Sequence, residues 1–307
     1  MTNGSIQPRP TRNERRDAAR EKARILREEQ KKRERRNKIL IQGGIIVAVL
    51  AVVAIVGVLI YQGVKPAGPG PRNMASDGIV LTGVDGAITA VETPALDDGE
   101  DPTPTVQDDS GNVANIVTYI DYLCPYCGQF ETTNNETIQA MVESGAATLE
   151  IHPIAILTNK SAGTQYSMRA ANAAACVADL SPNAFFDFNG LLFENQPEEG
   201  STGLTDDQLK GYAEEAGAGS LSEVRACIDD RRFKGWVEAA TTRALTQPVP
   251  NSDLQAVTGT PTVIVNGKQY QGSLTDASEF QAFVTQAASE SFTEATPTPT
   301  PTPAPAQ

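Results

Sequence analysis

The longest uncharged, mostly apolar run spans residues 39–61, with the sequence ILIQGGIIVAVLAVVAIVGVLIY, in which Gln42 is the only strongly polar side chain. About 20 apolar residues suffice to cross a bilayer as a helix, so this run predicts a transmembrane helix. A cleaved signal peptide is the alternative, but its apolar core has only roughly 7 to 15 residues and ends at a small-residue cleavage site. The run is too long for such a core, and the residues that follow, QGVKPAGPGPR, contain no A-x-A site.

Shorter apolar runs rich in β-branched residues follow the predicted membrane segment. GIVLTGVDGAITAV (78–91) places a D-G turn between two β-rich flanks and predicts a hairpin. NIVTYI (115–120) and ATLEIHPIAIL (147–157) predict two buried strands. PTVIVNGKQYQG (261–272) predicts a strand, an N-G turn and a second strand.

Helical patterns occupy the rest of this region. FETTNNETIQAMVES (130–144) predicts a helix that ends before Gly145, and residues 163–247 contain helical stretches without a convincing strand. TDASEFQAFVTQAAS (275–289) predicts a last helix with Asp276 as a candidate N-cap. The order is therefore β-α-β, an all-helical block and β-β-α. This order is typical of an α/β thioredoxin-like fold with an all-helical insertion, here preceded by a single transmembrane helix.

Charged residues are distributed unevenly around the predicted membrane helix. Residues 1–38 carry 14 Lys and Arg against 6 Asp and Glu, whereas the rest of the chain carries 11 against 32. By the positive-inside rule the basic arm stays in the cytoplasm and the chain after residue 61 lies outside. Glu residues interleave with the basic ones at helical spacings, which favours a topology signal beside anionic lipid over a nucleic-acid-binding arm. We therefore expect a single-pass protein of the cell membrane and no nucleic-acid partner.

Pro-rich segments flank the predicted folded region. QGVKPAGPGPRNMAS is rich in Pro and Gly and predicts a flexible stalk, whereas TEATPTPTPTPAPAQ cannot pack a core and predicts an extended tail. This tail is either a plain disordered segment or a spacer through a cell wall that carries glycans on Thr. The sequence thus predicts a basic cytoplasmic arm (1–38), a transmembrane helix (39–61), a stalk (62–76), a folded domain (77–289) with its insertion at about 163–247, and a Thr/Pro-rich disordered tail (290–307).

Two of the four cysteines, Cys124 and Cys127, form a C-x-x-C motif just after the strand at 115–120. A structural zinc site needs four ligands, but the other cysteines lie 49 and 100 residues beyond Cys127, and His152 is the only histidine. We therefore expect no metal. An inert disulfide would close so short a loop that it would add little stability. Because the predicted compartment is oxidising, the motif indicates a redox-active thiol couple.

The position of the motif distinguishes its two thiols. A strand delivers the chain to a helix whose first turn contains C-P-Y-C, and the unpaired N–H groups and dipole of a helix N-terminus stabilise a negative sulfur. Cysteines so placed have pKa values lowered to about 3.5 to 7.5, which predicts Cys124 as the attacking thiolate. Pro125 suits the first turn because the N–H that it lacks would be unpaired there. Cys127, one turn further in, is predicted to be the less exposed, resolving thiol.

A second motif lies far along the chain. TGTPTVIV places Pro261 directly before a β run, where an X-Pro bond can be cis. A cis-proline loop beside the cysteines would exclude metal and would offer the backbone of Thr260 to an extended substrate. The candidate substrate contacts are therefore Thr260, Pro125 and Tyr126. Four residues around the pair form either an apolar rim for unfolded chains or ordinary packing: Tyr122, Leu123, Tyr126 and Phe130.

Together, the D-x-x-C-P-Y-C-G motif, the helical insertion and the later G-T-P-T-V-I-V-N-G motif resemble the DsbA-like thiol:disulfide oxidoreductase family, in its membrane-anchored actinobacterial form. The resemblance covers about residues 78–289. It implies a thioredoxin fold, with Cys124 as nucleophile, Cys127 as resolving thiol and Pro261 as a cis-proline. The chain has Tyr126 where the best-known oxidases of this family have His, and C-P-Y-C also occurs in relatives that reduce or isomerise disulfides.

The remaining cysteines and two other polar residues have structural interpretations. With the C-x-x-C cysteines paired, one further pairing is left, so we predict a structural disulfide Cys176–Cys227 between two helices; two buried free thiols are the alternative. Asp121 is interpreted as a solvated or capping carboxylate, with a buried proton acceptor for the resolving thiol as the alternative. His152, in an apolar strand, is interpreted as a core or rim histidine rather than a catalytic base.

These patterns predict a membrane-tethered, extracytoplasmic thiol:disulfide oxidoreductase that passes its Cys124–Cys127 disulfide to reduced or unfolded secreted proteins. An isomerase or reductase of the same fold is one alternative, and a non-catalytic peptide-binding or redox-sensing domain is another. No bound cofactor is required, since the two sulfurs carry the electrons. The family resemblance implies a second partner, a quinone-linked membrane re-oxidant. The lack of an evident oligomerisation helix outside the membrane predicts a monomer.

Overall fold

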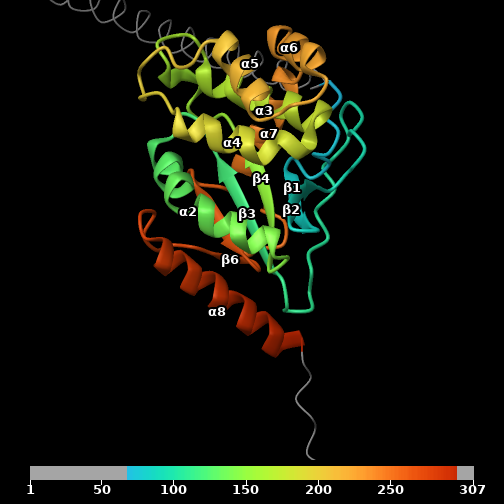
Figure 1. Cartoon of the computed structure of the whole chain (residues 1–307), viewed down its shortest axis with the longest axis vertical. Coiled ribbons are helices and arrows are strands. Elements are labelled where there is room, and N and C mark those ends of the chain that lie inside the picture. Colours follow the sequence, from blue (N-terminus) through green and yellow to red (C-terminus); the bar gives the residue numbers. More distant parts are fainter. Residues whose placement is uncertain (1–67, 296–307) are drawn as a thin grey trace, which may run out of the picture. The chain divides into compact units, whose positions relative to one another are not determined.

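The computed structural model describes residues 68–295, with side chains to residue 291 (Figure 1). The predicted basic arm, the predicted transmembrane helix and the Thr-Pro repeat lie outside the described residues. Among residues 68–295, no helix combines the length and the apolar character that crossing a membrane requires.

A mixed six-stranded sheet forms the centre of the described fold. Its strands follow the order β2-β1-β4-β3-β5-β6, in which β3 and β4 are parallel and the other neighbours antiparallel. Both predicted tight turns are present, because Asp85-Gly86 joins β1 to β2 and Asn266-Gly267 joins β5 to β6, all with the positive φ that such hairpins require. The strands are β1 (Ile79–Val84), β2 (Ala87–Ala90), β3 (Ala114–Ile120), β4 (Ala147–Pro153), β5 (Thr262–Val265) and β6 (Lys268–Gln269).

Helices α2 (Pro125–Glu143) and α8 (Ala277–Ala295) cover one face of the sheet (Figure 1). Ile116 of β3 belongs to the core cluster on this face. Phe130 of α2 meets Phe280 of α8 edge-on, with ring centroids 5.1 Å apart. This packing fixes α2 against the sheet and so determines where its N-terminus lies.

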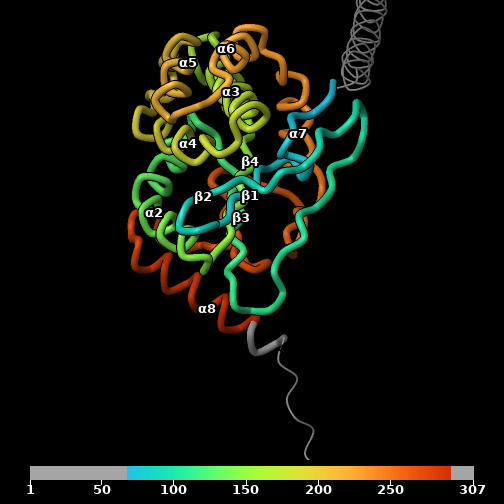
Figure 2. The backbone as a smooth tube through the Cα atoms, turned by 45° about the vertical axis from the view of Figure 1, so that its right-hand side comes forward, coloured from blue at the N-terminus to red at the C-terminus, as the bar shows by residue number. Residues whose placement is uncertain are grey.

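The opposite face of the sheet packs mainly against connections between elements. Val117 and Tyr119, which alternate with the α2-facing residues of β3, join a smaller apolar cluster with Val249. The long connection from β2 to β3 runs beside the sheet (Figure 2), and its Thr105 donates to Glu150 of β4 at 2.8 Å. Both faces of β3 are therefore covered, and all seven of its residues are buried.

His152 of β4 is a core residue, as the sequence predicts. Its Nε2 lies 3.1 Å from Glu150 Oε1, and its ring stacks on Tyr119 with centroids 4.3 Å apart. The imidazole is buried among these partners. These contacts give His152 a structural role within the sheet.

The insertion between β4 and β5 is helical. Its central helix is α3, in which every residue from Tyr166 to Ala178 is buried. Many of these residues are alanines, and small side chains allow neighbouring helices to approach closely. The helices are α3 (Tyr166–Leu180), α4 (Phe185–Glu194), α5 (Asp206–Glu215), α6 (Leu221–Asp229) and α7 (Lys234–Thr246), with short 3-10 turns η1 (Thr158–Lys160) and η2 (Pro182–Ala184).

The chain before β1 belongs to the folded domain, which corrects the predicted stalk. Met74 is fully buried, and Gly70 packs against the indole ring of Trp236. Residues 68–76 are therefore part of the domain rather than of a stalk at 62–76. Pro and Gly indicate a lack of regular structure, but composition does not show that a distant side chain covers the segment.

The last helix is longer than the sequence predicts. Helix α8 continues past residue 289 to Ala295, so the predicted tail (290–307) begins too early. Ser291 Oγ donates to the carbonyl oxygen of Ala287 at 3.0 Å and accepts from Asn266 Nδ2 at 3.1 Å. These bonds tie the end of α8 to the β5–β6 turn.

The predicted structural disulfide is present. Cys176 of α3 and Cys227 of α6 are bonded, with their Cα atoms 5.8 Å apart and a sequence separation of 51. The alternative of two buried free thiols is therefore wrong. The bond ties the central helix of the insertion to a peripheral one.

Reducing this disulfide should destabilise the domain. In a C124A/C127A variant the added reductant acts on Cys176–Cys227 alone, and opening a loop of this length should lower the free energy of unfolding by about 4 kcal/mol. Urea denaturation with and without reductant measures the change. A variant that lacks all four cysteines is the control, and an unchanged unfolding curve in the C124A/C127A variant would contradict the prediction.

A buried carboxyl group lies where α2 packs against α4. Glu131 is enclosed, and Asn189 Nδ2 donates to its Oε2 at 3.1 Å. Burial disfavours the charged form and raises the pKa of Glu131 to about 7, although the Asn189 hydrogen bond opposes this shift. The folded domain therefore holds a proton at Glu131 that the unfolded chain releases near the ordinary pKa of about 4.3.

Glu131 should make stability fall as pH rises from about 4.5 to 7. In that range the unfolded chain has lost the proton while the folded chain keeps it, so deprotonation favours unfolding. Between pH 5 and pH 8 the wild-type chain should lose about 2 to 3 kcal/mol more unfolding free energy than Glu131→Gln, which cannot ionise. Urea denaturation of both proteins at each pH gives the difference, and parallel profiles would rule out this effect.

Candidate active site

The C-P-Y-C motif lies where β3 ends and α2 begins. Cys124 is the N-cap of α2, with φ −75° and ψ 116°, and Pro125 is the first helical residue. The amide of Cys124 donates to Asp121 O at 2.9 Å, and its carbonyl oxygen accepts from Gly128 N at 3.1 Å. Because Pro125 has no N–H, its position at the first turn leaves no donor unpaired. The predicted placement of Cys124 at a helix N-terminus is therefore present.

Asp121 braces the turn before Cys124 from inside the domain. Its Oδ1 accepts from Leu123 N at 2.9 Å, and its Oδ2 accepts from Leu157 N at 2.9 Å and from Ser167 Oγ at 2.7 Å. The carboxyl group is completely buried, so its interpretation as a solvated group is wrong. Helix α2 has no side-chain cap, so Asp121 does not cap it, and the alternative of a buried proton acceptor for the resolving thiol stays a prediction. Burial raises the pKa of Asp121, and these donors oppose that shift.

The two cysteines of the motif are separate thiols with different exposure. Cys124 is 5% exposed, whereas Cys127 is fully enclosed. The Cys127 amide lies deeper in α2, and the Cys127 sulfur accepts from Asp121 N at 3.5 Å. Both residues are buried, and Cys124 is the less enclosed of the two.

Their environments shift the two pKa values in opposite directions. A hydrogen bond from the Cys127 thiol, together with Thr260 and the N–H groups of Cys127 and Tyr126, lowers the pKa of Cys124 to about 6, although burial opposes this. Burial, followed by the proximity of Cys124, raises the pKa of Cys127 well above its usual value. Near neutral pH the pair thus holds one thiolate, at Cys124, and one thiol, at Cys127.

The second motif lies beside the first, although 136 residues separate them in sequence. The Cys124 thiol donates to the carbonyl oxygen of Thr260 at 3.2 Å, and the Thr260–Pro261 peptide bond is cis. Pairing between β5 and β3 brings the Thr260 loop to this edge of the sheet. Thr260 and Pro261 are thus neighbours of Cys124, as the sequence predicts.

The apolar residues around the pair divide into exposed and buried ones. Tyr126 is 61% exposed, and Pro125 beside it is also exposed. The surface next to Cys124 therefore offers Pro125 and Tyr126 to a partner. Three residues that were candidates for an apolar rim are instead fully buried packing residues: Tyr122, Leu123 and Phe130.

One residue at the site has no signal in the sequence. Gln196 follows α4 in the helical insertion, and its Nε2 donates to Tyr122 O at 3.1 Å and to Cys124 O at 2.9 Å. It lies in a polar loop, outside any motif, so only the folded structure brings it to the cysteines.

Comparison with known proteins agrees with this geometry. The family model described as Thioredoxin matches residues 103–301. The reduced form of DsbA from Mycobacterium tuberculosis is 29% identical, with a TM-score of 0.50, and the match covers 72% of this chain and 100% of that one. The disulfide bond oxidoreductase DsbG of the same organism is 31% identical, with a TM-score of 0.47, over 60% of this chain and 86% of the other.

A longer protein shares part of this sequence. The Na(+)/H(+) antiporter NhaA 1 of Salinispora arenicola is 32% identical over 163 residues, which are 52% of this chain and 21% of the antiporter. The chain thus spans about a fifth of the length of the curated relative that it matches. The family model, which covers more than half of the chain, and the likeness to DsbA confirm the resemblance predicted from the sequence. The chain belongs to the thioredoxin family, and its fold is that of the DsbA-type thiol:disulfide oxidoreductases.

Proposed function

We propose that the chain is a membrane-tethered, extracytoplasmic oxidoreductase that donates its Cys124–Cys127 disulfide to secreted proteins. The observation that carries this proposal is the asymmetry of the pair, because Cys124 is the less enclosed cysteine and has a lowered pKa, while Cys127 is fully enclosed and has a raised pKa. A stabilised Cys124 thiolate favours the reduced form of the pair. A protein whose reduced form is favoured gives its disulfide away.

The geometry supports a two-step transfer. In the oxidised chain a substrate thiolate attacks Cys124 Sγ, the Cys124–Cys127 bond breaks, and Cys127 leaves and takes up a proton as its raised pKa requires. A second substrate thiolate then attacks the substrate sulfur of the mixed disulfide and expels Cys124 as a thiolate. A thiol of low pKa is a good leaving group, which speeds this release. Two electrons pass to the cysteine pair, and the substrate gains one disulfide.

The Thr260 loop and the exposed residues of C-P-Y-C form the surface on which a substrate would lie. The Thr260 backbone lies next to the sulfur of Cys124, and Pro125 and Tyr126, which follow Cys124 in the chain, have exposed side chains. An unfolded, reduced chain can place backbone and apolar side chains on such a surface without a specific sequence. This arrangement supports secreted proteins in general as the substrate class.

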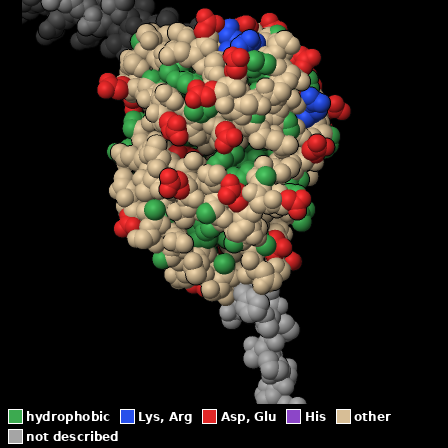
Figure 3. Space-filling model, viewed as in Figure 1, with side chains coloured by type: hydrophobic (Ala, Val, Ile, Leu, Met, Phe, Trp, Pro, Cys, Tyr) green, Lys and Arg blue, Asp and Glu red, His purple; other side chains and the backbone are tan. Residues whose placement is uncertain are grey.

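An oxidising location agrees with two further features. The Cys176–Cys227 disulfide is of a kind that persists outside the reducing cytoplasm. The domain face in Figure 3 carries many Asp and Glu side chains and few Lys or Arg, and a surface with such a net charge keeps a tethered domain soluble. The anchor is the predicted helix at 39–61. Each transfer leaves a dithiol, so the proposal includes a quinone-linked membrane oxidoreductase that accepts its two electrons.

The proposed roles can be tested by trapping. When reduced Cys127→Ala is mixed with a protein that contains disulfides, Cys124 should attack and the mixed disulfide should persist, because no resolving thiol is present. Cys124→Ala should form at least tenfold less of this adduct, since its remaining thiol is enclosed and protonated. Mass spectrometry under non-reducing conditions counts the adducts.

Disulfide transfer to reduced, unfolded ribonuclease by the oxidised wild-type chain tests the direction. One disulfide should be transferred for each chain consumed. Equal adduct formation by the two variants would contradict the assigned roles. An oxidised chain that keeps its disulfide, while the reduced chain opens disulfides of the substrate, would instead identify a reductase.

A further inference from the structure

Gln196 reaches from the connection between α4 and α5 to the turn before Cys124. Its Nε2 donates to the carbonyl oxygens of Tyr122 at 3.1 Å and Cys124 at 2.9 Å. Both acceptors are backbone oxygens, so the side-chain amide must present its nitrogen to them. One side chain thus bridges the two carbonyl groups on either side of Leu123.

The Cys124 carbonyl group held by Gln196 also accepts the first hydrogen bond of α2, from Gly128 N. The orientation of this peptide group determines where the N-cap residue stands relative to the free N–H groups of the first turn. The Cys127 thiol lowers the pKa of Cys124 most, and the N–H groups of Cys127 and Tyr126 in that turn lower it further. Gln196 therefore contacts the backbone that sets the environment of the reactive sulfur.

Gly128 provides the space that Gln196 needs. A Cβ atom built on Gly128 would lie 2.2 Å from Gln196 Oε1, and its three nearest atoms all belong to Gln196. The backbone of Gly128 is helical, so an alanine there would be compatible with α2, and the atoms nearest to its Cβ would be those of Gln196. Gly128, directly after the second cysteine, is thus complementary in size to the Gln196 side chain that packs against it.

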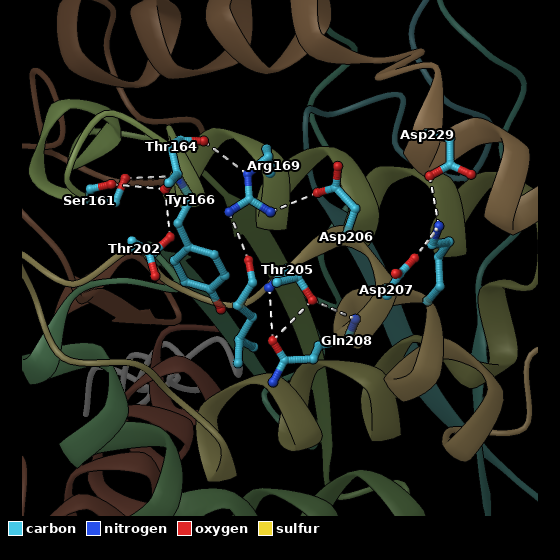
Figure 4. A network of polar contacts seen from close by, with 12 residues as sticks. Ser161, Thr164, Tyr166, Arg169, Thr202, Thr205, Asp206, Asp207, Gln208 and Asp229 are labelled. Carbon is cyan, nitrogen blue, oxygen red and sulfur yellow. Dashed lines mark hydrogen bonds and ion pairs between the residues drawn. The ribbon is translucent and has the colours of Figure 1, made fainter.

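The connection that carries Gln196 is fixed to the helical insertion. Thr164 Oγ1 donates to Thr202 O at 2.6 Å, and Arg169 Nη2 donates to Leu204 O at 2.7 Å (Figure 4). These bonds lie on either side of Gly203, whose close approach to the Tyr166 ring leaves no room for a Cβ atom. Because the connection is anchored at these points, it can hold the Gln196 side chain in a fixed position.

We propose that Gln196 is a positioning residue for the cysteine pair, through which the helical insertion holds the N-cap of α2 in the geometry that favours the Cys124 thiolate. The inference deepens the proposed function and rests on it. It assigns to the insertion a part in tuning the thiol chemistry, in addition to any contact with substrates.

The test compares the pH dependence of Cys124 alkylation by iodoacetamide in the reduced full-length chain, its Gln196→Ala variant and its Gly128→Ala variant. In the wild type the rate should be half-maximal near pH 6. Either substitution should move this midpoint up by about one unit, which lowers the rate at pH 6 about fivefold. Gly190→Ala is the matched control, because a Cβ atom there would meet only Asn135 Nδ2, at 3.8 Å.

Gly128→Ala separates positioning from a merely structural role. Alanine is a better helix former than glycine. If Gln196 had only a structural role, Gly128→Ala should therefore be at least as stable as the wild type and should keep the same midpoint pH of alkylation. The inference predicts a raised midpoint in spite of the improved helix. In the Gln196→Ala background, Gly128→Ala should add no further shift, because both changes remove the same contact.

Different outcomes bear on different claims. An unchanged midpoint in folded Gln196→Ala, or shifts that add in the double variant, would overturn the role of Gln196 while leaving disulfide transfer by the wild type intact. A wild-type midpoint near the ordinary thiol pKa of about 8.5 would instead count against the proposed function itself. Retained disulfide transfer in the wild type, with a shifted midpoint in both single variants and not in Gly190→Ala, is the result that we expect.

Discussion

The N-terminus of α2 lies directly beyond the end of β3, and the chemistry of the site depends on this junction. The sheet fixes the end of β3 because both of its faces are covered, and the packing of α2 on α8 fixes the helix. The unpaired N–H groups of the first turn must then point at the residue that caps the helix. That residue is Cys124, so the fold itself places partial positive charge at the reactive sulfur.

The two sulfurs differ because they stand at different depths of the same helix. Cys124 caps the helix, where the Cys127 thiol and the backbone donors of the first turn can stabilise its negative form. Cys127 lies one turn further in, where desolvation keeps it protonated. The turn that carries them is held from two sides, by Asp121 from the interior and by Gln196 from the insertion. The insertion thus contributes to the site as well as to the size of the domain.

The sequence predicts those features that nearby residues encode. C-x-x-C spacing, a proline at the first helical position and the D-G and N-G turns are local signals, and the structure contains each of these four features. The features that it did not predict depend on distant partners. Gln196 follows Tyr122 by 74 residues in a loop without a motif. Gly70 packs against the side chain of Trp236, which lies far along the chain. Asp121 is buried against the start of α3, where Ser167 donates to it.

The equilibrium reduction potential of the Cys124–Cys127 pair against glutathione tests the central claim most directly. It compares the free energies of the dithiol and disulfide forms, and so it measures whether the helix N-terminus stabilises the reduced pair enough for disulfide donation. A value between about −120 and −180 mV, at the oxidising end of the range for thioredoxin-like proteins, is the predicted result. A value near about −270 mV, which is typical of a reducing thioredoxin, would contradict it.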